Sequence, residues 1–355
     1  MNKIEKMELP LISIIVLAYN VERYISECLS AIVNQTYSNI EIIIVVNGKS
    51  NDSTEAIVSE FSQKDDRIKL VYNHKNSIIG EGRLLGLNAV SGNYFTFVDG
   101  DDYLESSGIK DLVSTAIHSP DGDVIIGSYQ QVDETGKFLS IAGMPEYQEL
   151  LPKEYLPLCF LYVDTLIHGK LYSAKLLQET SIQFVLNNSL GEDKMIHLQL
   201  VSNASKIVRC LPVVHNFRKN SKSITNNLQY KNFRDEFINF GKIGTQVFQP
   251  QEYFMEKTFV TAFKSHHLIL LYHCFFTGGV KIFTDAKEMT SELLYGGYLK
   301  KKNIRAYLNQ WKLYIPILEL YRINKYIGGL MCWLLNTGRI LMRMIRNRII
   351  TNYFK

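Results

Sequence analysis

Short apolar segments alternate with helical segments through the first hundred residues, and this alternation constrains the fold more than any other feature. The apolar runs are rich in β-branched residues and too short for helices, so we expect them to be strands. Strands that alternate with amphipathic helices at this spacing form βαβ units. We therefore predict an α/β fold with a mostly parallel sheet flanked by helices. The expected strands are residues 11–17, 40–46, 68–72 and 94–98, and the expected helices are residues 22–33, 53–61 and 82–90.

Composition agrees with a globular protein and excludes several other classes. The chain has 355 residues, of which 46% are hydrophobic and 21% are charged, so disorder and a collagen-like fold are excluded. Its five cysteines are scattered without a CxxC pair, which argues against a disulfide framework or a zinc ribbon and favours a reducing cytosol. We find no signal-peptide pattern and no apolar run of the ~18–20 residues that cross a bilayer. We expect a protein that is neither secreted nor membrane-spanning.

The pattern changes near residue 227, where long helical stretches replace the alternation. We therefore predict two parts, an α/β domain at residues 1–226 and a helical region at residues 227–355. Residues 299–355 carry 12 Lys and Arg against one acid, whereas the net charge of the whole chain is only +4. A basic tail on an acidic body predicts a polyanionic partner for the tail.

Polar residues follow three of the expected strands. Ligands of open α/β sheets bind beyond the carboxyl ends of the strands, and Asn20, Asn47 and Asp99 lie there, after the first, second and fourth strands. Asp99, Asp101 and Asp102 would repel one another after the fourth strand, and a hard divalent cation, Mg²⁺ or Mn²⁺, would offset that repulsion. The alternative is a solvated acidic turn that caps the next helix. A P-loop and a GxGxxG dinucleotide motif are both absent from the sequence.

Several further motifs, taken together, resemble glycosyltransferase family 2, whose members have the GT-A fold. Each motif is weak alone, and the specificity comes from their shared order and spacing over about residues 10–226. The chain departs from the family at Val46-Asn47-Gly48-Lys49, where the family has "DDGS", and at Leu84, where it has Asn. The matching segments are SIIVLAYN from residue 13, NQTY from 34, IEIIIV from 40, Arg83 and Gly86 of "ARNxG", GNYFTFVDGDD from 92, KLY from 170, GED from 191, and Arg218 with SIT from 223.

The resemblance implies a donor site for a UDP-sugar. It assigns Tyr19 to stacking on the base, and Asn47 would hydrogen-bond the base in place of the family's Asp. It also implies a metal site in which Asp101 ligates Mn²⁺ or Mg²⁺ and Asp99 contacts the ribose or a metal-bound water. Arginines of the site would contact the phosphates through their forked guanidinium groups. The implied donor nucleotide-binding residues are Tyr19, Asn20, Asn47, Arg83, Asp99, Arg218 and Ser223.

The resemblance also implies residues that act on the acceptor. Glu192 and Asp193 precede an apolar periodic run, so we expect both in the first turn of a helix, where the helix dipole favours an ionised carboxylate. Asp193 is the predicted general base, and the alternative is an acid that merely decorates a helix N-terminus. Asp102 would either support the metal ligands or contact the acceptor. His168 would either contact the acceptor or be structural, and Glu192 is a further candidate acceptor residue.

The end of the chain predicts a basic amphipathic helix. Arg339, Arg343 and Arg346 recur on one face, and Leu341 and Ile345 lie on the other. Such a helix can lie in the interface of an anionic membrane. The alternative is a helix that packs on the protein with its Arg face in water. We expect no nucleic acid partner, because no motif or fold supports one.

The resemblance implies an inverting, metal-dependent glycosyltransferase that acts on a glycan or lipid-linked oligosaccharide in surface polysaccharide synthesis. We expect it in the cytoplasm, associated peripherally with the inner face of the cell membrane. A processive synthase is disfavoured because the sequence has no QxxRW motif. The alternative of another class is a non-catalytic member of the same fold that binds a sugar nucleotide or a glycan. Asn47 and Leu84 keep this alternative open.

Overall fold

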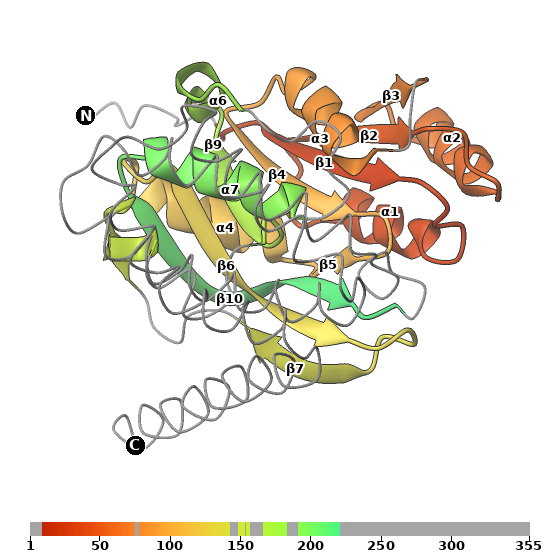
Figure 1. Ribbon diagram of the computed structural model, residues 1–355. Helices are drawn as coiled ribbons and strands as arrows, with labels where there is room; N and C mark the ends of the chain where they lie inside the picture. Colours follow the sequence, from red (N-terminus) through yellow and green to blue (C-terminus); the bar gives the residue numbers. More distant parts are fainter. Residues whose placement is uncertain are drawn as a thin grey trace, which may run out of the picture. The chain divides into compact units, whose positions relative to one another are not determined.

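The fold is described here from a computed structural model, which covers residues 9–74, 78–142, 148–152, 154–156, 166–182 and 191–220. Within these ranges ten strands form one sheet, in the order β3-β2-β1-β4-β9-β6-β10-β5, with β7 beside β6 and β8 beside β10 (Figure 1). None of the helices in these ranges is long and apolar enough to cross a membrane. The predicted boundary near residue 227, the helical region with its basic tail, and Ser223 lie outside the described residues.

The first four predicted strands are confirmed, and they run parallel to one another. β1 lies between β2 and β4, and β3 pairs with the outer side of β2. Because parallel strands end at the same edge, the polar residues that follow β1, β2 and β4 share the carboxyl edge of this half of the sheet. The strands are β1 at Ile12–Ala18, β2 at Ile40–Asn47, β3 at Ile68–Asn73 and β4 at Tyr94–Asp99.

The later strands make the sheet mixed. β6 and β10 run in the same direction as the first four strands, so the predicted mostly parallel sheet is confirmed for the six longer strands, and the four shorter strands run antiparallel to their neighbours. β9 runs antiparallel to both β4 and β6, whereas β10 runs parallel to β6. The short strands β5 and β8 pair antiparallel with β10, and β7 pairs antiparallel with β6. These strands are β5 at Tyr103–Leu104, β6 at Val124–Val132, β7 at Phe138–Ala142, β8 at Glu149–Leu150, β9 at Lys170–Ser173 and β10 at Ile207–Arg218.

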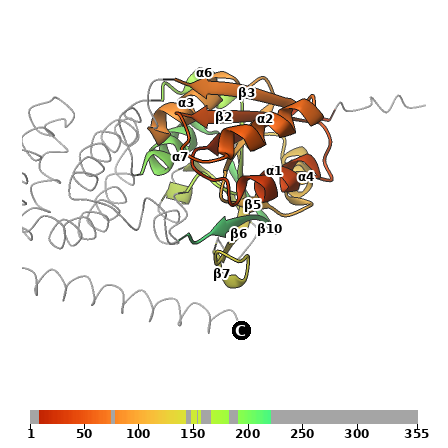
Figure 2. The same cartoon turned by 90° about the vertical axis from the view of Figure 1, so that its right-hand side faces the viewer.

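Helices cover both faces of the sheet (Figure 2). The buried side chains of α1 and α4 recur at spacings of three and four residues and join Ile14 of β1 in one core cluster. α3 packs on the opposite face, where a side chain at Gly86 would meet Ile15. The three predicted helices are confirmed with ends shifted by up to three residues. The helices are α1 at Ile25–Val33, α2 at Thr54–Lys64, α3 at Ile79–Asn88, α4 at Gly108–His118, α6 at Lys175–Glu179 and α7 at Glu192–Asn203.

Candidate active site

The turn after β4 gathers three carboxylates at the carboxyl edge of the sheet. The N–H of Gly100 donates to the carbonyl of Leu17 at 3.0 Å, and the N–H of Asp102 donates to the carbonyl of Asp99 at 2.9 Å. A Cβ at Gly100 would lie 2.7 Å from the Leu17 oxygen, so a glycine is needed for this close approach to β1. The result is a short turn, fixed to β1, that carries Asp99, Asp101 and Asp102.

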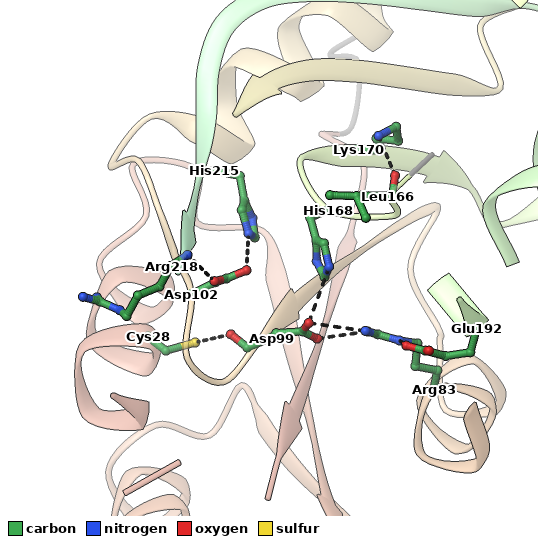
Figure 3. Close-up of polar contacts among 10 residues, drawn as sticks. All are labelled: Cys28, Arg83, Asp99, Asp102, Leu166, His168, Lys170, Glu192, His215 and Arg218. Atoms are coloured by element: carbon green, nitrogen blue, oxygen red, sulfur yellow. Dashed lines mark hydrogen bonds and ion pairs between the residues drawn. The ribbon is translucent and has the colours of Figure 1, made fainter. Parts of the chain in front are cut away.

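Asp99 ends β4 and is held by two basic side chains from other elements (Figure 3). Arg83 of α3 places Nη1 3.0 Å from Oδ1, and His168, which precedes β9, places Nε2 3.4 Å from Oδ2. Burial alone would raise the pKa of Asp99, but the charge and the hydrogen bond of Arg83, together with the nearby His168 and His215, outweigh it, and the pKa falls to about 2. Burial also lowers the pKa of His168 to about 3, so this imidazole is neutral. Asp99 is therefore an ionised carboxylate anchored mainly by Arg83.

Asp102 is anchored to β10. Its Oδ2 lies 2.9 Å from Nε2 of His215, and its Oδ1 accepts the backbone N–H of Arg218 at 2.8 Å. The side chain is only 2% exposed, and burial is the main cause that raises the pKa of Asp102. With both oxygens bonded inside the protein, this environment fits the support role predicted for Asp102 better than an acceptor contact.

Asp101 lies between these two acids and forms no ion pair with any described residue. Burial, followed by the charges of Asp102 and Asp99, raises the pKa of Asp101 to about 8, although a hydrogen bond with Asn220 opposes the shift. A nearby divalent cation would favour the ionised form of such a carboxyl. Carboxylate oxygens on one short turn are also the donor set that Mg²⁺ and Mn²⁺ prefer. The residues present therefore fit the predicted metal.

The predicted helix that begins with two acids is confirmed, because Glu192 and Asp193 form the first turn of α7. Glu192 is 5% exposed, and its Oε1 accepts a hydrogen bond from Nε of Arg83 at 3.2 Å. Burial, followed by the charge of Asp193, raises the pKa of Glu192 to about 7, and burial also raises the pKa of Asp193. Asp193 forms no ion pair within the described ranges. Among the described residues, the two adjacent acids thus differ, because Glu192 forms an ion pair with Arg83 and Asp193 forms none.

Arg83 joins the turn after β4 to α7. Its guanidinium contacts Asp99 and Glu192, which are 93 residues apart along the chain, and lies 5.7 Å from the centre of the Phe97 ring. The residue is 2% exposed, and the two acids raise its pKa against the opposing effect of burial. The phosphate contact predicted for Arg83 stays a prediction, since the structure gives this side chain protein partners.

Arg218 is also enclosed by protein. Its Nη2 lies 2.6 Å from Glu27, and its Nε donates to the carbonyl of Asp101 at 2.9 Å. Its Cζ lies 4.9 Å and 5.2 Å from the ring centres of Tyr24 and Tyr103, so the guanidinium contacts two aromatic rings. The side chain therefore holds the turn after β4 against α1. This arrangement differs from the predicted forked contact with phosphate, which stays untested.

The loops that follow β1 and β2 are bonded to each other. Asn20 has a φ of 52°, its Oδ1 accepts the N–H of Asn51 at 2.8 Å, and its own N–H donates to Oγ of Ser50 at 3.3 Å. Asn tolerates this left-handed backbone better than most residues do. Tyr19 precedes it and is half-buried. The two predicted donor residues Tyr19 and Asn20 thus lie on a loop that has a defined conformation.

Asn47 lies inside the protein. It is 1% exposed, its Nδ2 donates to the carbonyl of Ile78 at 3.3 Å, and its Oδ1 accepts from Nδ2 of Asn73 at 2.9 Å. A Cβ at Gly82 would lie 2.7 Å from its Oδ1, so α3 packs closely against this amide. The predicted contact between Asn47 and the base would require these bonds to rearrange, and the structure gives it no support.

His215 is the residue of this site that the sequence did not reveal. It lies in β10, where a single histidine forms no motif with its neighbours. The available signal was its position three residues before Arg218 on the same strand. The side chain is nevertheless completely buried and bonded to Asp102, one of the predicted site residues.

Known proteins similar to this chain are glycosyltransferases. The family described as Glycosyl transferase family 2 matches residues 13–177. The glycosyltransferase GlyA of Streptococcus pneumoniae is 33% identical over 208 residues, which are 56% of this chain but only 29% of GlyA. The uncharacterized glycosyltransferase EpsJ of Bacillus subtilis is 30% identical over 237 residues, which are 65% of this chain and 67% of EpsJ. The chain therefore matches less than a third of GlyA and two thirds of EpsJ.

A solved structure supports the same assignment at the level of the fold. Residues 1–349 of TarS from S. aureus, in complex with UDP-GlcNAc, superpose with a TM-score of 0.70 at 18% identity, and the match covers 92% of each chain. At this identity the likeness establishes the fold alone, which is the GT-A fold. Taken with the extent of the match to EpsJ, it shows that the chain belongs to glycosyltransferase family 2.

Proposed function

We propose that the chain transfers a sugar from a UDP-sugar to a hydroxyl group of a cell-surface glycan, with inversion at the anomeric carbon. One observation carries this proposal. Arg83 lies 3.0 Å from Asp99 and 3.2 Å from Glu192, and thereby brings the turn after β4 to the N-terminus of α7. Each side of this bridge has a second acid without an ion pair in the described ranges, Asp101 on the turn and Asp193 on the helix. A metal ligand and a general base are the two groups that displacement of a nucleoside diphosphate requires.

Asp101, with Asp99 beside it, would hold Mn²⁺ or Mg²⁺. Support comes from the environment of Asp101, where burial and two neighbouring acids disfavour the ionised carboxylate in the absence of a cation. When bound, the cation supplies positive charge that stabilises the departing diphosphate. Arg218 holds the ligand-bearing turn through its hydrogen bond to the Asp101 carbonyl.

Asp193 is the proposed base because Glu192 is already bound to Arg83. The acceptor hydroxyl gives its proton to the Asp193 carboxylate while its oxygen forms a bond to C1 of the sugar. On the opposite face of the sugar, the bond between C1 and the β-phosphate oxygen breaks, and UDP leaves with the electron pair. A single displacement of this kind inverts C1 and needs no covalent nucleophile. The N-terminus of α7 favours the charged form of the base.

The proposal also names a donor, an acceptor and a location. UDP is the proposed nucleotide because TarS, which has the same fold, binds UDP-GlcNAc in its solved structure. Tyr19 and Asn20 are the proposed base-side contacts. The acceptor would be a glycan or a lipid-linked oligosaccharide, and the basic tail would hold the protein at the anionic inner face of the membrane. The competing idea is a non-catalytic member of the same fold that binds a sugar nucleotide or a glycan, since Asn47 and Leu84 replace the family's Asp and Asn.

Measurement of UDP release tests this proposal and distinguishes it from the non-catalytic alternative. The full chain is incubated with UDP-GlcNAc and other UDP-sugars, in the presence of Mn²⁺ or EDTA, with and without glycan acceptors. The proposal predicts Mn²⁺-dependent UDP release that an acceptor accelerates. Asp121→Asn is a suitable control, because Asp121 is an exposed acid paired with Lys206, remote from the proposed machinery. Mn²⁺-dependent binding without UDP release from any donor would favour the non-catalytic alternative.

A further inference from the structure

The acids of the turn after β4 are held to different degrees (Figure 3). Asp99 is held by side chains of α3 and of the segment before β9. Asp102 has a partner on each carboxylate oxygen, and both partners, the His215 imidazole and the Arg218 N–H, belong to β10. Asp101 has no ion pair among the residues described. The turn is thus fixed on both sides of Asp101, the acid proposed to ligate the metal.

The position of His215 is determined by its strand. Its backbone pairs with Leu104 of β5 on one side and with Tyr129 of β6 on the other, so β10 is anchored at this residue. The side chain is completely buried, and its ring centre lies 5.3 Å from that of His168. A Cβ at Gly169 would lie 3.4 Å from the Cβ of His215, which shows how closely the neighbouring turn packs. The imidazole is therefore a rigid partner for the Asp102 carboxylate.

The contact with His215 has a consequence for the adjacent ligand. Asp101 and Asp102 are neighbours in sequence, so the backbone conformation that orients one carboxylate also orients the other. A rigid bond at Asp102 limits the conformations that the turn can adopt before a cation arrives. Pre-organisation of this kind lowers the free energy needed to assemble a metal site.

We infer that His215 is a positioning residue, which fixes Asp102 and through it the turn, so that Asp101 presents its carboxylate to the divalent cation of the donor complex. This inference rests on the proposed function and adds a determinant of metal affinity to it. His215 contacts no reacting atom in this account and acts only through Asp102. Hydrogen-bonding partners of metal ligands usually change metal affinity by about 10–100-fold, and His215 lies one residue further away from the cation.

Two substitutions in the full chain test the inference. His215→Phe removes the polar contact with Asp102, whereas His215→Gln keeps an amide N–H that can donate to Asp102. We expect His215→Phe to raise the Mn²⁺ concentration for half-maximal UDP-sugar binding by roughly 10-fold, with a much smaller change in turnover at saturating Mn²⁺. His215→Gln should restore most of the Mn²⁺ affinity. A merely structural histidine would not produce this separation of metal affinity from turnover.

His197 offers a matched control. It is another completely buried histidine, but its ring nitrogens lie 2.8 Å and 3.0 Å from the hydroxyls of Tyr172 and Tyr155. His197→Gln should lower the melting temperature without changing the Mn²⁺ requirement. A double variant gives a second test, because Asp102→Asn combined with His215→Phe should lose no more Mn²⁺ affinity than Asp102→Asn alone. Where His215→Phe does not fold, Asp102→Asn alone tests the same contact, because it weakens the bond to His215 and should raise the Mn²⁺ requirement in the same direction.

Three outcomes would overturn the inference. Either the Mn²⁺ requirement is unchanged when the His215–Asp102 contact is removed, or the losses in the double variant add. The third outcome concerns Asp102, His168 and His215, whose potential ligand atoms all lie within 4.8 Å of one another. If these residues bind a cation directly, metal binding will survive Asp101→Asn and disappear in His215→Phe. Failure of the proposed function looks different, because the wild-type chain would then show no Mn²⁺-dependent binding of UDP-sugars, and both proposals would fall.

Discussion

Buried carboxylates occur at both ends of the parallel strands, but their surroundings differ. At the amino ends, Glu41 of β2 accepts hydrogen bonds from the hydroxyl of Ser13 at 2.5 Å, from Lys69 at 2.6 Å, and from the N–H and hydroxyl of Ser91 at 2.8 Å each. These bonds outweigh the effect of burial and lower the pKa of Glu41 to about 2. At the carboxyl ends, burial and neighbouring acids raise the pKa of Asp101 to about 8.

We interpret the difference as one between an acid that stabilises the fold and an acid that we propose to bind a cation. The four hydrogen bonds to Glu41 come from three residues, one on β1, one on β3 and one in the segment before β4, so its charge is compensated within the protein and ties these elements together. Asp101 lacks such compensation in the described ranges, although the same sheet positions it. Buried charge without a partner costs stability, and such groups cluster at functional sites. We therefore expect substitutions at the carboxyl end to reduce activity with little loss of stability, and substitutions at the amino end to reduce stability with little loss of activity.

The largest effect is expected at the carboxyl end, from Asp193→Asn. The amide is nearly isosteric with the carboxylate but cannot take the acceptor's proton. Turnover should fall by about 10²–10⁴-fold, while UDP-sugar affinity and the melting temperature stay close to wild type. Steady-state UDP release, together with calorimetric binding, measures both quantities. Near wild-type turnover would move the base to another residue, with Glu192 as the next candidate.

At the amino end, Glu41→Gln should have the opposite profile. It removes the charge that binds Lys69 and leaves the hydroxyls of Ser13 and Ser91 with a poorer partner. Hydrogen bonds to a charged group contribute about 1.5–3 kcal/mol, so the free energy of unfolding should fall by that order. Urea denaturation measures the loss, and turnover of the remaining folded protein should be unchanged. A Glu41→Gln variant that is stable but has low activity would contradict the idea that the amino-end acid serves only the stability of the fold.

Lowering the pH should abolish the contribution of Glu41. Its pKa is about 2 in the folded chain and about 4.5 as an ordinary value, so the folded state favours the ionised form. The stabilisation is therefore complete above about pH 4.5 and is lost as the pH falls towards 2. The difference in unfolding free energy between the wild type and Glu41→Gln should shrink over this interval. A difference that stays constant from pH 6 to pH 3 would show that the charge of Glu41 is unimportant.

The smallest effect is expected from Lys69→Met, which removes one partner of Glu41. The Lys69 side chain is 55% exposed, so water screens this ion pair. Exposed pairs contribute about 0.2–1 kcal/mol, and the loss should lie in that range. Comparing the thermal melting of Lys69→Met and Glu41→Gln shows how much of the stability contributed by Glu41 comes from its ion pair with Lys69. Equal losses in the two variants would mean that the serine bonds contribute nothing.

The parallel half of the fold was predictable because its signals are local. Strands β1 to β4 are short β-branched runs, and α1 buries residues at helical spacing, so periodicity alone places them. The acids at the start of α7 were predictable for the same reason, because an apolar periodic run follows them. Asp99 and Asp101 could be placed at the carboxyl edge from the end of β4. Each of these predictions needed only a few adjacent residues.

The remaining features depend on contacts between distant segments, which no local pattern encodes. Arg83 binds Asp99 and Glu192 only because α3 and α7 pack on the same side of the sheet. The antiparallel β9 has four residues, too few for a periodic signal. His215 contacts Asp102, although the two residues are 113 positions apart in the sequence. The predictions for Ser223, the boundary near residue 227 and the basic tail lie outside the described residues.

The central claim is that Asp101 is an uncompensated acid that binds the divalent cation of the donor complex. Calorimetric titration of UDP-GlcNAc into the wild type and Asp101→Asn, with Mn²⁺ and with EDTA, tests it most directly. We expect Mn²⁺ to strengthen binding to the wild type and to have no effect on the variant. We also expect the metal-free variant to melt at or above the wild-type temperature, because the amide replaces a carboxyl group whose ionised form is disfavoured by burial and by the neighbouring acids. Equal Mn²⁺ enhancement in both proteins, or a clear loss of stability in the metal-free variant, would contradict the claim.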